Sequence, residues 1–485
     1  MGTAEEITRS DRKIGSAATN GSLASWIVMT QEKPSQSFWR NTALEPLPIL
    51  AVALVLTAAI LFLALPKLDS MMVPTNQSGA PLYTVGFADG YDLIANNLVQ
   101  GNGYRFQSNA SETMMREPGY PLFLAGAFKI GGYNITTARC ANWLLTICIA
   151  FLLMRLAEHI TGDKTVAVLA TLLFLFFPST LIAEARGGVE ILFILVVLIF
   201  MLFLHNALAK GEWWRYLIAG LALGVVVQVR STPLVFPFFL FIFLFFSTRG
   251  VTERARAFFH VTVLILGMTV VMVPWLVRNY KLVHHLVPTA TVQGVALQEG
   301  QYTCENLSFE NNFYALQKRA GLIRADIAAQ LGLPFDGAYY YQVFFTPKDE
   351  WTFNQTLFAR GKKEYAQHPA LLPTCACKNL FNFWFLGKTW HATWLNMVVQ
   401  VPLLVLAVTG FFLLWRRGQL RRIGPILAFI VCIEAVDLPI IAHARHSVPL
   451  VPFLAIPASL AALSLWSKCQ LWARSSAVDD VLKRA

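Results

Sequence analysis

Two aspartates stand close together shortly after the first long apolar stretch of the chain. Asp89, Asp92 and Asn96 recur at helical spacing, so a short helix opened by Asp89 would carry both carboxylates on one face. Beside a low-dielectric surface the charged form of a carboxylate is disfavoured. Its pKa then rises, and it becomes a better proton acceptor at neutral pH. Aspartate is also common at helix starts, so a capping role for Asp89 is an equally open interpretation.

Arginines at the ends of apolar stretches form a second set of candidates. They are Arg116, Arg186, Arg230, Arg278 and Arg445. The planar guanidinium group suits phosphate because it donates two parallel hydrogen bonds. Arginine at such positions can also anchor a helix by extending its charge to the lipid headgroups. Arg230 stands above the others, because the short polar break on which it lies would not reach the headgroups comfortably.

The composition indicates what kind of scaffold positions these residues. Of the 485 residues, 56% are hydrophobic and 14% are charged, whereas an average soluble domain is about 45–50% apolar and about 25% charged. The 36 phenylalanines and 13 tryptophans also exclude a disordered or fibrous chain. The net charge of +11 is clustered beside apolar stretches, which is typical of topology signals. We therefore expect an all-α polytopic protein in the lipid bilayer, with no nucleic acid as partner.

Ten transmembrane helices are expected in this chain. A span needs about 17–25 mainly apolar residues, and eight stretches qualify: 47–66, 138–157, 166–183, 189–207, 258–277, 397–415, 423–441 and 447–466. The stretch Leu217–Phe246 is too long for one span and is broken around Arg230 and Pro233, which predicts two short helices joined by a polar turn. Counting it as two keeps the arginine run 416–422 on the cytoplasmic side with the other basic loops, as the positive-inside rule requires.

This topology divides the chain into five regions and places both ends in the cytoplasm. Residues 1–46 form a cytoplasmic tail, and residues 47–277 contain helices one to seven with a first outer loop at 67–137. Residues 278–396 form a large extracytoplasmic loop, residues 397–466 the last three helices, and residues 467–485 a second tail. No signal peptide is predicted, because the first apolar stretch lies behind a polar tail. The expected location is the cytoplasmic (inner) membrane, with the candidate site facing outside.

Short helices are expected in both outer loops. The first loop would carry the helix that contains the two aspartates. The second contains two helix-like segments, Ala315–Leu331 and Asp349–Phe385, and the latter is interrupted at His368-Pro369 and at Pro373. These helices would hold the candidate residues at the outer boundary of the membrane.

Four motifs in this order resemble the polytopic GT-C glycosyltransferases, and more narrowly the bacterial branch related to protein O-mannosyltransferases and aminoarabinose transferases. The first combines Asp89 with Gly101-Asn102-Gly103-Tyr104 and Arg116-Glu117-Pro118-Gly119-Tyr120-Pro121; the others are Pro274-Trp275-Leu276-Val277-Arg278-Asn279-Tyr280, His368-Pro369 ahead of Lys378, and Arg445-His446-Ser447-Val448-Pro449. They extend over most of residues 47–466.

The resemblance implies that Asp89 is the catalytic carboxylate. It would deprotonate an acceptor hydroxyl or amine, which then attacks the anomeric carbon of a sugar linked to a polyprenyl phosphate. Many relatives carry a Glu directly after this Asp, whereas this chain has Gly90, so Asp92 becomes a second catalytic candidate. The resemblance also assigns the carrier phosphate to Arg116, in a substrate-binding segment with Glu117 and Tyr120. The physical need for further cations adds Arg230, Arg278 and Arg445.

Cysteine and histidine residues give weaker signals. The chain has seven cysteines and no Cys-x-x-Cys pair, which disfavours a zinc ribbon or a complete disulfide framework. On the expected topology Cys304, Cys375 and Cys377 lie in an oxidising compartment, where Cys304 could pair with either of the other two, or with neither. No cofactor is identified; a divalent cation stays open, because two histidine pairs could bind a metal, although surface histidines are more common. These pairs are His284 with His285 and His443 with His446.

The sequence favours one function and leaves two alternatives. The favoured one is transfer of a sugar from a polyprenyl-phosphate donor to an unknown acceptor (protein, lipid or glycan) outside the membrane. A transporter or flippase for lipid-linked sugars, or a non-catalytic subunit of cell-envelope assembly, would use similar helices. A transporter concentrates polar residues near the bilayer midplane, whereas this chain places its carboxylates and arginines at the outer boundary, which favours the enzyme.

Overall fold

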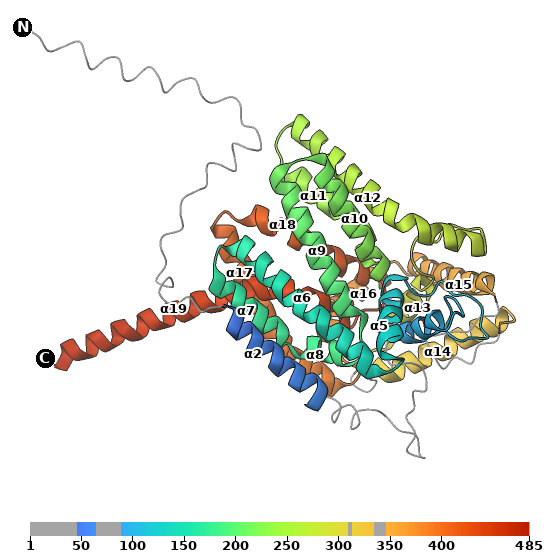
Figure 1. The fold of residues 1–485 in the computed structure, drawn as a ribbon, viewed down its shortest axis with the longest axis horizontal. Coiled ribbons are helices and arrows are strands. Elements are labelled where there is room, and N and C mark those ends of the chain that lie inside the picture. The colour runs from blue at the N-terminus through green and yellow to red at the C-terminus, as the bar shows by residue number, and fades with distance from the viewer. Residues whose placement is uncertain (1–45, 65–88, 309–312, 334–345, 485) are drawn as a thin grey trace, which may run out of the picture. The chain divides into compact units, whose positions relative to one another are not determined.

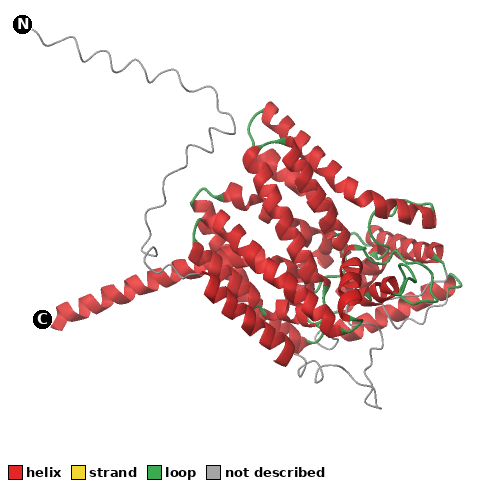
Figure 2. Ribbon diagram, viewed as in Figure 1, coloured by secondary structure: helices red, strands yellow, loops and turns green. Residues whose placement is uncertain are grey.

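The computed structural model describes residues 46–64, 89–308, 313–333 and 346–484, and the elements in these ranges are helices (Figures 1 and 2). Helices satisfy every backbone hydrogen bond within one segment, which a lipid-exposed chain requires. The apolar helices are α2 (Pro46–Ala59) with its continuation η2 (Ile60–Ala64), α6 (Ile135–Thr161), α7 (Lys164–Leu175), α8 (Pro178–Ala185), α9 (Val189–Lys210), α10 (Trp213–Val229), α11 (Phe236–Ser247), α12 (Val251–Val283), α17 (Trp390–Arg416), α18 (Leu420–Asp437) and α19 (Val451–Arg484).

Six segments among the described residues are long and apolar enough to cross a membrane. They are Pro46–Leu63, Ile135–Thr161, Val189–Lys210, Val251–Val283, Trp390–Arg416 and Ala444–Gln470. The pair α7 and α8, bent by 51° at the break between them, would be a seventh. The polytopic all-helical class is thus confirmed. The count of ten stays a prediction, because α10 and the segment Thr232–Ser247 are apolar but shorter, and α18, which covers the predicted span 423–441, is not among the candidate spans. The outer position of the loops also stays a prediction.

The break around Arg230 is confirmed. Helix α10 ends at Val229, Arg230 is extended, and a short 3-10 turn, η3 (Thr232–Val235), leads into α11. Pro233 lacks a backbone donor, and it disfavours a helical conformation of the residue before it. The chain must therefore leave the helix here, and a polar turn remains between two apolar helices.

Helices α10 and α12 lie side by side (Figure 1) and approach closely through glycines. A Cβ atom on Gly220 would lie 2.1 Å from the carbonyl oxygen of Leu264, and one on Gly224 would lie 2.7 Å from that of Met268. Glycines four residues apart on one helix face allow such backbone contact inside a membrane. The small residues of α10 therefore fix the helix that ends at Arg230 against its neighbour.

The two segments predicted to be outer loops contain six further helices among the described residues. They are α4 (Tyr91–Val99), α5 (Gly119–Gly131), α13 (Gln293–Asn306), α14 (Phe313–Gln330), α15 (Pro347–Gln367) and α16 (Leu371–Phe385). The two helical segments predicted in the second loop are confirmed, except that the interruption lies only around His368-Pro369, and Pro373 falls in the first turn of α16. Proline is tolerated there because the first-turn amides have no partner inside the helix. Helix α13 was not predicted, because its buried face mixes polar with apolar side chains.

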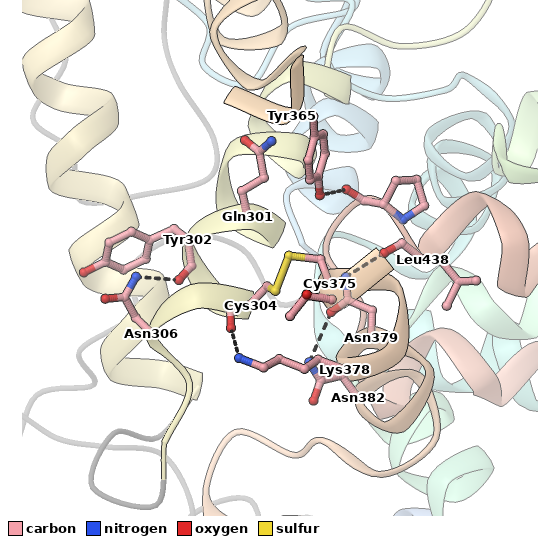
Figure 3. The surroundings of a disulfide bond; sticks show 12 residues. Gln301, Tyr302, Cys304, Asn306, Tyr365, Cys375, Lys378, Asn379, Asn382 and Leu438 are labelled. Carbon is pink, nitrogen blue, oxygen red and sulfur yellow. Dashed lines mark hydrogen bonds between the residues drawn. A yellow bond between two sulfur atoms is a disulfide. The ribbon is translucent and has the colours of Figure 1, made fainter. Parts of the chain in front are cut away.

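A disulfide joins Cys304 of α13 to Cys375 of α16 (Figure 3). It selects one of the two pairings that the sequence left open, and Cys377 is exposed with a free thiol. Around it, Lys378 Nζ donates to the carbonyl oxygen of Cys304 at 2.8 Å. Asn379 Nδ2 donates to the carbonyl oxygens of Leu438 and Ile440, each at 2.8 Å. The disulfide therefore links α13 to α16, the helix that contacts the segment before Arg445.

Loss of this disulfide is expected to destabilise the protein. The cysteines are 71 residues apart, so Cys304→Ser releases a long loop in the unfolded chain, and the free energy of unfolding should fall by about 2–4 kcal/mol. The melting temperature of the purified protein in detergent measures the effect. Cys377→Ser is the matched control, since this thiol is free. An equal loss in both variants would contradict the pairing.

Candidate functional site

Asp89 lies just before α4, and not at its first position as predicted. Asp89 has φ of 51° and Gly90 has φ of 80°, both in the left-handed region that glycine adopts at no steric cost. The helix begins at Tyr91. The expectation that α4 carries both carboxylates on one face is therefore wrong, because the turn at Gly90 removes Asp89 from the helix. Asp92 is fully buried, and its Oδ2 accepts a hydrogen bond from the Tyr133 hydroxyl at 2.9 Å.

The carboxylate of Asp89 forms an ion pair with Arg445. Arg445 lies in η4 (Ala444–Leu450), and its guanidinium also binds Glu190 in the first turn of α9. The distances are 2.5 Å from Arg445 Nε to Glu190 Oε1 and 3.2 Å from Arg445 Nη2 to Glu190 Oε2. One arginine thus lies between two carboxylates. Such charge-assisted, two-point contacts are the strong class of hydrogen bond.

The two carboxylates differ in exposure. The side chain of Asp89 is 43% exposed and that of Glu190 is 2% exposed. Asp89 can therefore meet a ligand at the surface of the site, whereas Glu190 supports Arg445 from behind. Glu190 was not singled out in the sequence, although a single acidic residue at the start of an apolar helix is a signal that could have found it.

The pKa of Asp89 is lowered, against the expectation from the sequence. Desolvation acts to raise it, but the positive charges of Arg445 and Arg116 outweigh desolvation and hold the pKa at about 2. A neighbouring opposite charge favours the charged form of a carboxylate. The expectation of a raised pKa is wrong because it considered the membrane boundary and not the cations that the fold brings beside Asp89. In the ligand-free protein Asp89 is therefore a permanent anion near neutral pH.

Arg116 contacts the backbone of Asp89. Its Nε and Nη2 atoms donate to the carbonyl oxygen of Asp89 at 3.4 and 3.3 Å. Its guanidinium also lies over the ring of Tyr91, 5.3 Å from the centroid. The predicted phosphate ligand and the predicted catalytic carboxylate are thus brought together by the turn before α4.

Glu117 connects this segment to the break between α10 and η3. Its Oε1 accepts a hydrogen bond from the backbone amide of Ser231 at 3.2 Å, directly beside Arg230. No hydrogen bond or ion pair joins the Arg230 side chain to another residue in the described part of the chain. Glu117 is therefore used within the fold, whereas the Arg230 cation has no such partner in residues 46–64, 89–308, 313–333 or 346–484.

Lys388 adds a cation that the sequence reasoning missed. Its loop lies beside η4, because the backbone amide of Ala444 donates to the carbonyl oxygen of Leu386 at 2.9 Å. The pKa of Lys388 is lowered by desolvation and by the positive charges of Arg186 and Arg445, against the opposing effect of Asp89. Lysine in a loop next to an apolar helix gave no distinctive signal in the sequence. Its charge adds to a basic environment around the exposed carboxylate.

Arg278 and Tyr120 lie near the site and contact protein atoms. Arg278 Nη1 donates to the carbonyl oxygen of Thr113 at 2.8 Å, and its guanidinium lies over the Trp275 ring, 4.7 Å from the centroid. Tyr120 is fully buried, and its hydroxyl donates to the carbonyl oxygen of Gly187 at 2.5 Å. Both side chains therefore position backbone segments near the site and do not line it with Asp89.

The environment of Asp89 predicts a specific chemical behaviour. Carbodiimides modify protonated carboxyl groups, and at pH 6 a carboxyl with a pKa of about 2 is protonated in only about one molecule in 10⁴. Asp89 should therefore resist modification, as measured by peptide mass spectrometry. In Arg445→Gln the pKa should rise and labelling of Asp89 should increase. Efficient labelling of Asp89 in the unchanged protein would contradict this environment.

Comparison with known proteins shows what part of the chain is similar to. The family described as dolichyl-phosphate-mannose-protein mannosyltransferase matches residues 115–277, a segment that contains Arg116, Glu190 and Arg230 but neither Asp89 nor Arg445. None of the curated proteins matches the chain in sequence.

One solved structure supports a shared fold, and two others show a weaker likeness. The apo oligosaccharyltransferase of Archaeoglobus fulgidus has a TM-score of 0.50 and 13% identity, over 91% of this chain and 53% of that one. AglB of the same organism, in complex with an inhibitory peptide and a dolichol-phosphate, gives 0.49 and 13%, over 91% and 52%. ArnT from Cupriavidus metallidurans, bound to undecaprenyl phosphate, gives 0.36 and 16%, over 84% and 77%. The chain spans about half the length of the archaeal proteins. Its match to the mannosyltransferase family over residues 115–277 and its oligosaccharyltransferase-like fold confirm the resemblance to polytopic GT-C glycosyltransferases.

Proposed function

We propose that this chain is a membrane glycosyltransferase that moves a sugar from a polyprenyl-phosphate donor to an acceptor on the outer face of the membrane. The observation that carries the proposal is the exposed, ionised carboxylate of Asp89 in contact with Arg445 and beside Arg116. Such a pair offers a proton acceptor and phosphate-binding cations in one place. The matched family is described by a dolichyl-phosphate-mannose donor, which supports a polyprenyl-phosphate carrier here.

The reaction requires two charge movements. The oxygen or nitrogen of the acceptor forms a bond to the anomeric carbon, and the bond between that carbon and the phosphate oxygen breaks with its electron pair. The acceptor's proton passes to the Asp89 carboxylate. Although a pKa of about 2 makes Asp89 a weak base, the acceptor becomes strongly acidic as it bonds to carbon, so an ionised carboxylate within reach suffices. Backside attack at that carbon inverts its configuration.

The leaving phosphate gains negative charge as the bond breaks, so cations must face it. Arg116, Arg230 and Arg445 are the proposed ligands, and Lys388 extends this basic set. Preorganised cations stabilise developing charge most strongly where water is scarce, as at the boundary of a membrane. Among the described residues no group of three His, Cys, Asp or Glu side chains is placed to bind a metal ion, and the divalent cation that the sequence analysis left open stays open.

A direct assay tests the proposal. The purified protein in nanodiscs would receive undecaprenyl phosphate carrying a radiolabelled sugar, such as mannose or aminoarabinose, with a detergent extract of membranes as the source of acceptors. We expect release of undecaprenyl phosphate and label in an acceptor fraction. Passage of the labelled lipid across proteoliposome membranes without any transfer would instead support the transporter alternative.

A separate experiment tests on which side of the membrane the reaction takes place. Reporter fusions after Gly250 and after Lys348 should report the cytoplasm and the exterior respectively, because the arginine-rich loops are expected inside. The opposite pattern would discard the outward-facing site together with the ten-helix topology.

A further inference from the structure

Glu190 is a buried carboxylate to which the proposed reaction gives no role. It is 2% exposed, and both of its oxygens accept hydrogen bonds from Arg445. Burying a carboxylate is costly unless it is paired and hydrogen-bonded. Its position in the first turn of α9 is favourable for a negative charge, because the helix dipole is positive at that end.

The turn between α8 and α9 is shaped to place this carboxylate. A Cβ atom on Gly188 would lie 2.3 Å from Glu190 Oε2, so only glycine leaves room for the side chain. Two side chains hold the turn: the Tyr120 hydroxyl donates to the carbonyl oxygen of Gly187 at 2.5 Å, and Asn142 Nδ2 donates to that of Gly188 at 3.1 Å. Helices α5 and α6 therefore fix the turn, and the turn fixes Glu190.

Arg445 has one exposed and one buried partner. Asp89 is 43% exposed and comes from a turn, whereas Glu190 is buried in a helix. When Asp89 accepts the proton of the acceptor it becomes neutral, and its attraction for Arg445 falls. At the same moment the electron pair of the breaking bond adds negative charge to the phosphate. The Arg445 cation is therefore needed at the phosphate when Asp89 no longer holds it.

We propose that Glu190 is a positioning residue that keeps Arg445 in the site while its guanidinium passes from Asp89 to the phosphate of the leaving carrier. This inference rests on the proposed function. Glu190 bonds to Nε and Nη2, whereas Asp89 bonds to Nη1. The edge of the guanidinium that faces Asp89 can thus change partner while the opposite edge stays bound.

The test is Glu190→Gln, which keeps the shape of the side chain but removes its charge. Arg445 retains Asp89, so folding should survive, as the melting temperature would show. We expect kcat to fall by about 10–100-fold, since small misplacement of a transition-state group has effects of this size, with a smaller change in the KM for donor. Glu190→Asp, which restores the charge on a shorter side chain, should recover part of the loss. Glu184→Gln is the matched control: Glu184 is equally buried, but it accepts from Thr146 Oγ1 at 3.1 Å and not from Arg445.

Combination with Arg445 distinguishes positioning from a general structural role. If Glu190 acts through Arg445, the double variant Glu190→Gln/Arg445→Gln should have a kcat less than about 3-fold below that of Arg445→Gln alone. The effects of neighbouring residues in one network are not additive. A full 10–100-fold loss in the Arg445→Gln background, or an unchanged kcat in Glu190→Gln, overturns the inference. If Asp89→Asn and Arg445→Gln themselves leave transfer intact, the proposed function has failed instead.

Discussion

Asp89→Asn is expected to lower the rate of sugar transfer by about 10²–10⁴-fold, the usual contribution of a general base. The amide keeps the size of the side chain and its ability to accept a hydrogen bond from Arg445, but it cannot take a proton at neutral pH. Arg445 also retains Glu190 as a partner, so the variant should stay folded. Turnover of a labelled polyprenyl-phosphate sugar by the purified variant measures the effect.

Asp92→Asn is the control for this prediction. Asp92 is fully buried and bonds to the Tyr133 hydroxyl, so its replacement should affect stability more than transfer. Loss of transfer in Asp92→Asn with near-normal transfer in Asp89→Asn would move the catalytic role to Asp92. If neither change affects an assay that detects the unchanged protein, the glycosyltransferase mechanism is wrong and the transporter alternative becomes the better one.

Arg116→Ala is expected to raise the KM for the lipid donor by about 10–100-fold and the KM for the acceptor much less. A hydrogen bond to a charged group contributes about 1.5–3 kcal/mol, which corresponds to this range. Arg116 lies next to the backbone of Asp89, where a carrier phosphate would have to lie for its sugar to reach the carboxylate. Kinetics with donor and acceptor varied separately measure the two constants.

Arg105→Ala is the matched control for Arg116. Arg105 belongs to the same segment between α4 and α5, but its Nη1 donates to the carbonyl oxygen of Ala110 at 2.9 Å, within its own loop. Its removal should leave the KM for donor unchanged. An unchanged donor KM in Arg116→Ala as well would remove Arg116 from the phosphate site and leave Arg230 and Arg445 as the candidates.

The sequence by itself determined the class of the protein and much of its helix pattern. Three features depend on neighbouring residues along the chain: the apolar stretches of membrane length, the polar break at Arg230 and Pro233, and the helices between α12 and α17. For the same reason the family resemblance could be recognised from local motifs around Arg116. Helix α13 escaped prediction because its buried face is partly polar, so that local hydrophobic periodicity does not reveal it.

Only the tertiary structure decided how the site is assembled. The partners of Arg445 come from the turn before α4 and from α9, and Glu190 is 255 residues away in sequence. The pKa of Asp89 fell instead of rising because its value depends on which cations the fold places beside it. Likewise, the choice of Cys375 over Cys377 as the partner of Cys304 followed from the packing of α13 against α16. Such long-range contacts depend on distances in the folded structure, and local sequence patterns do not predict those distances.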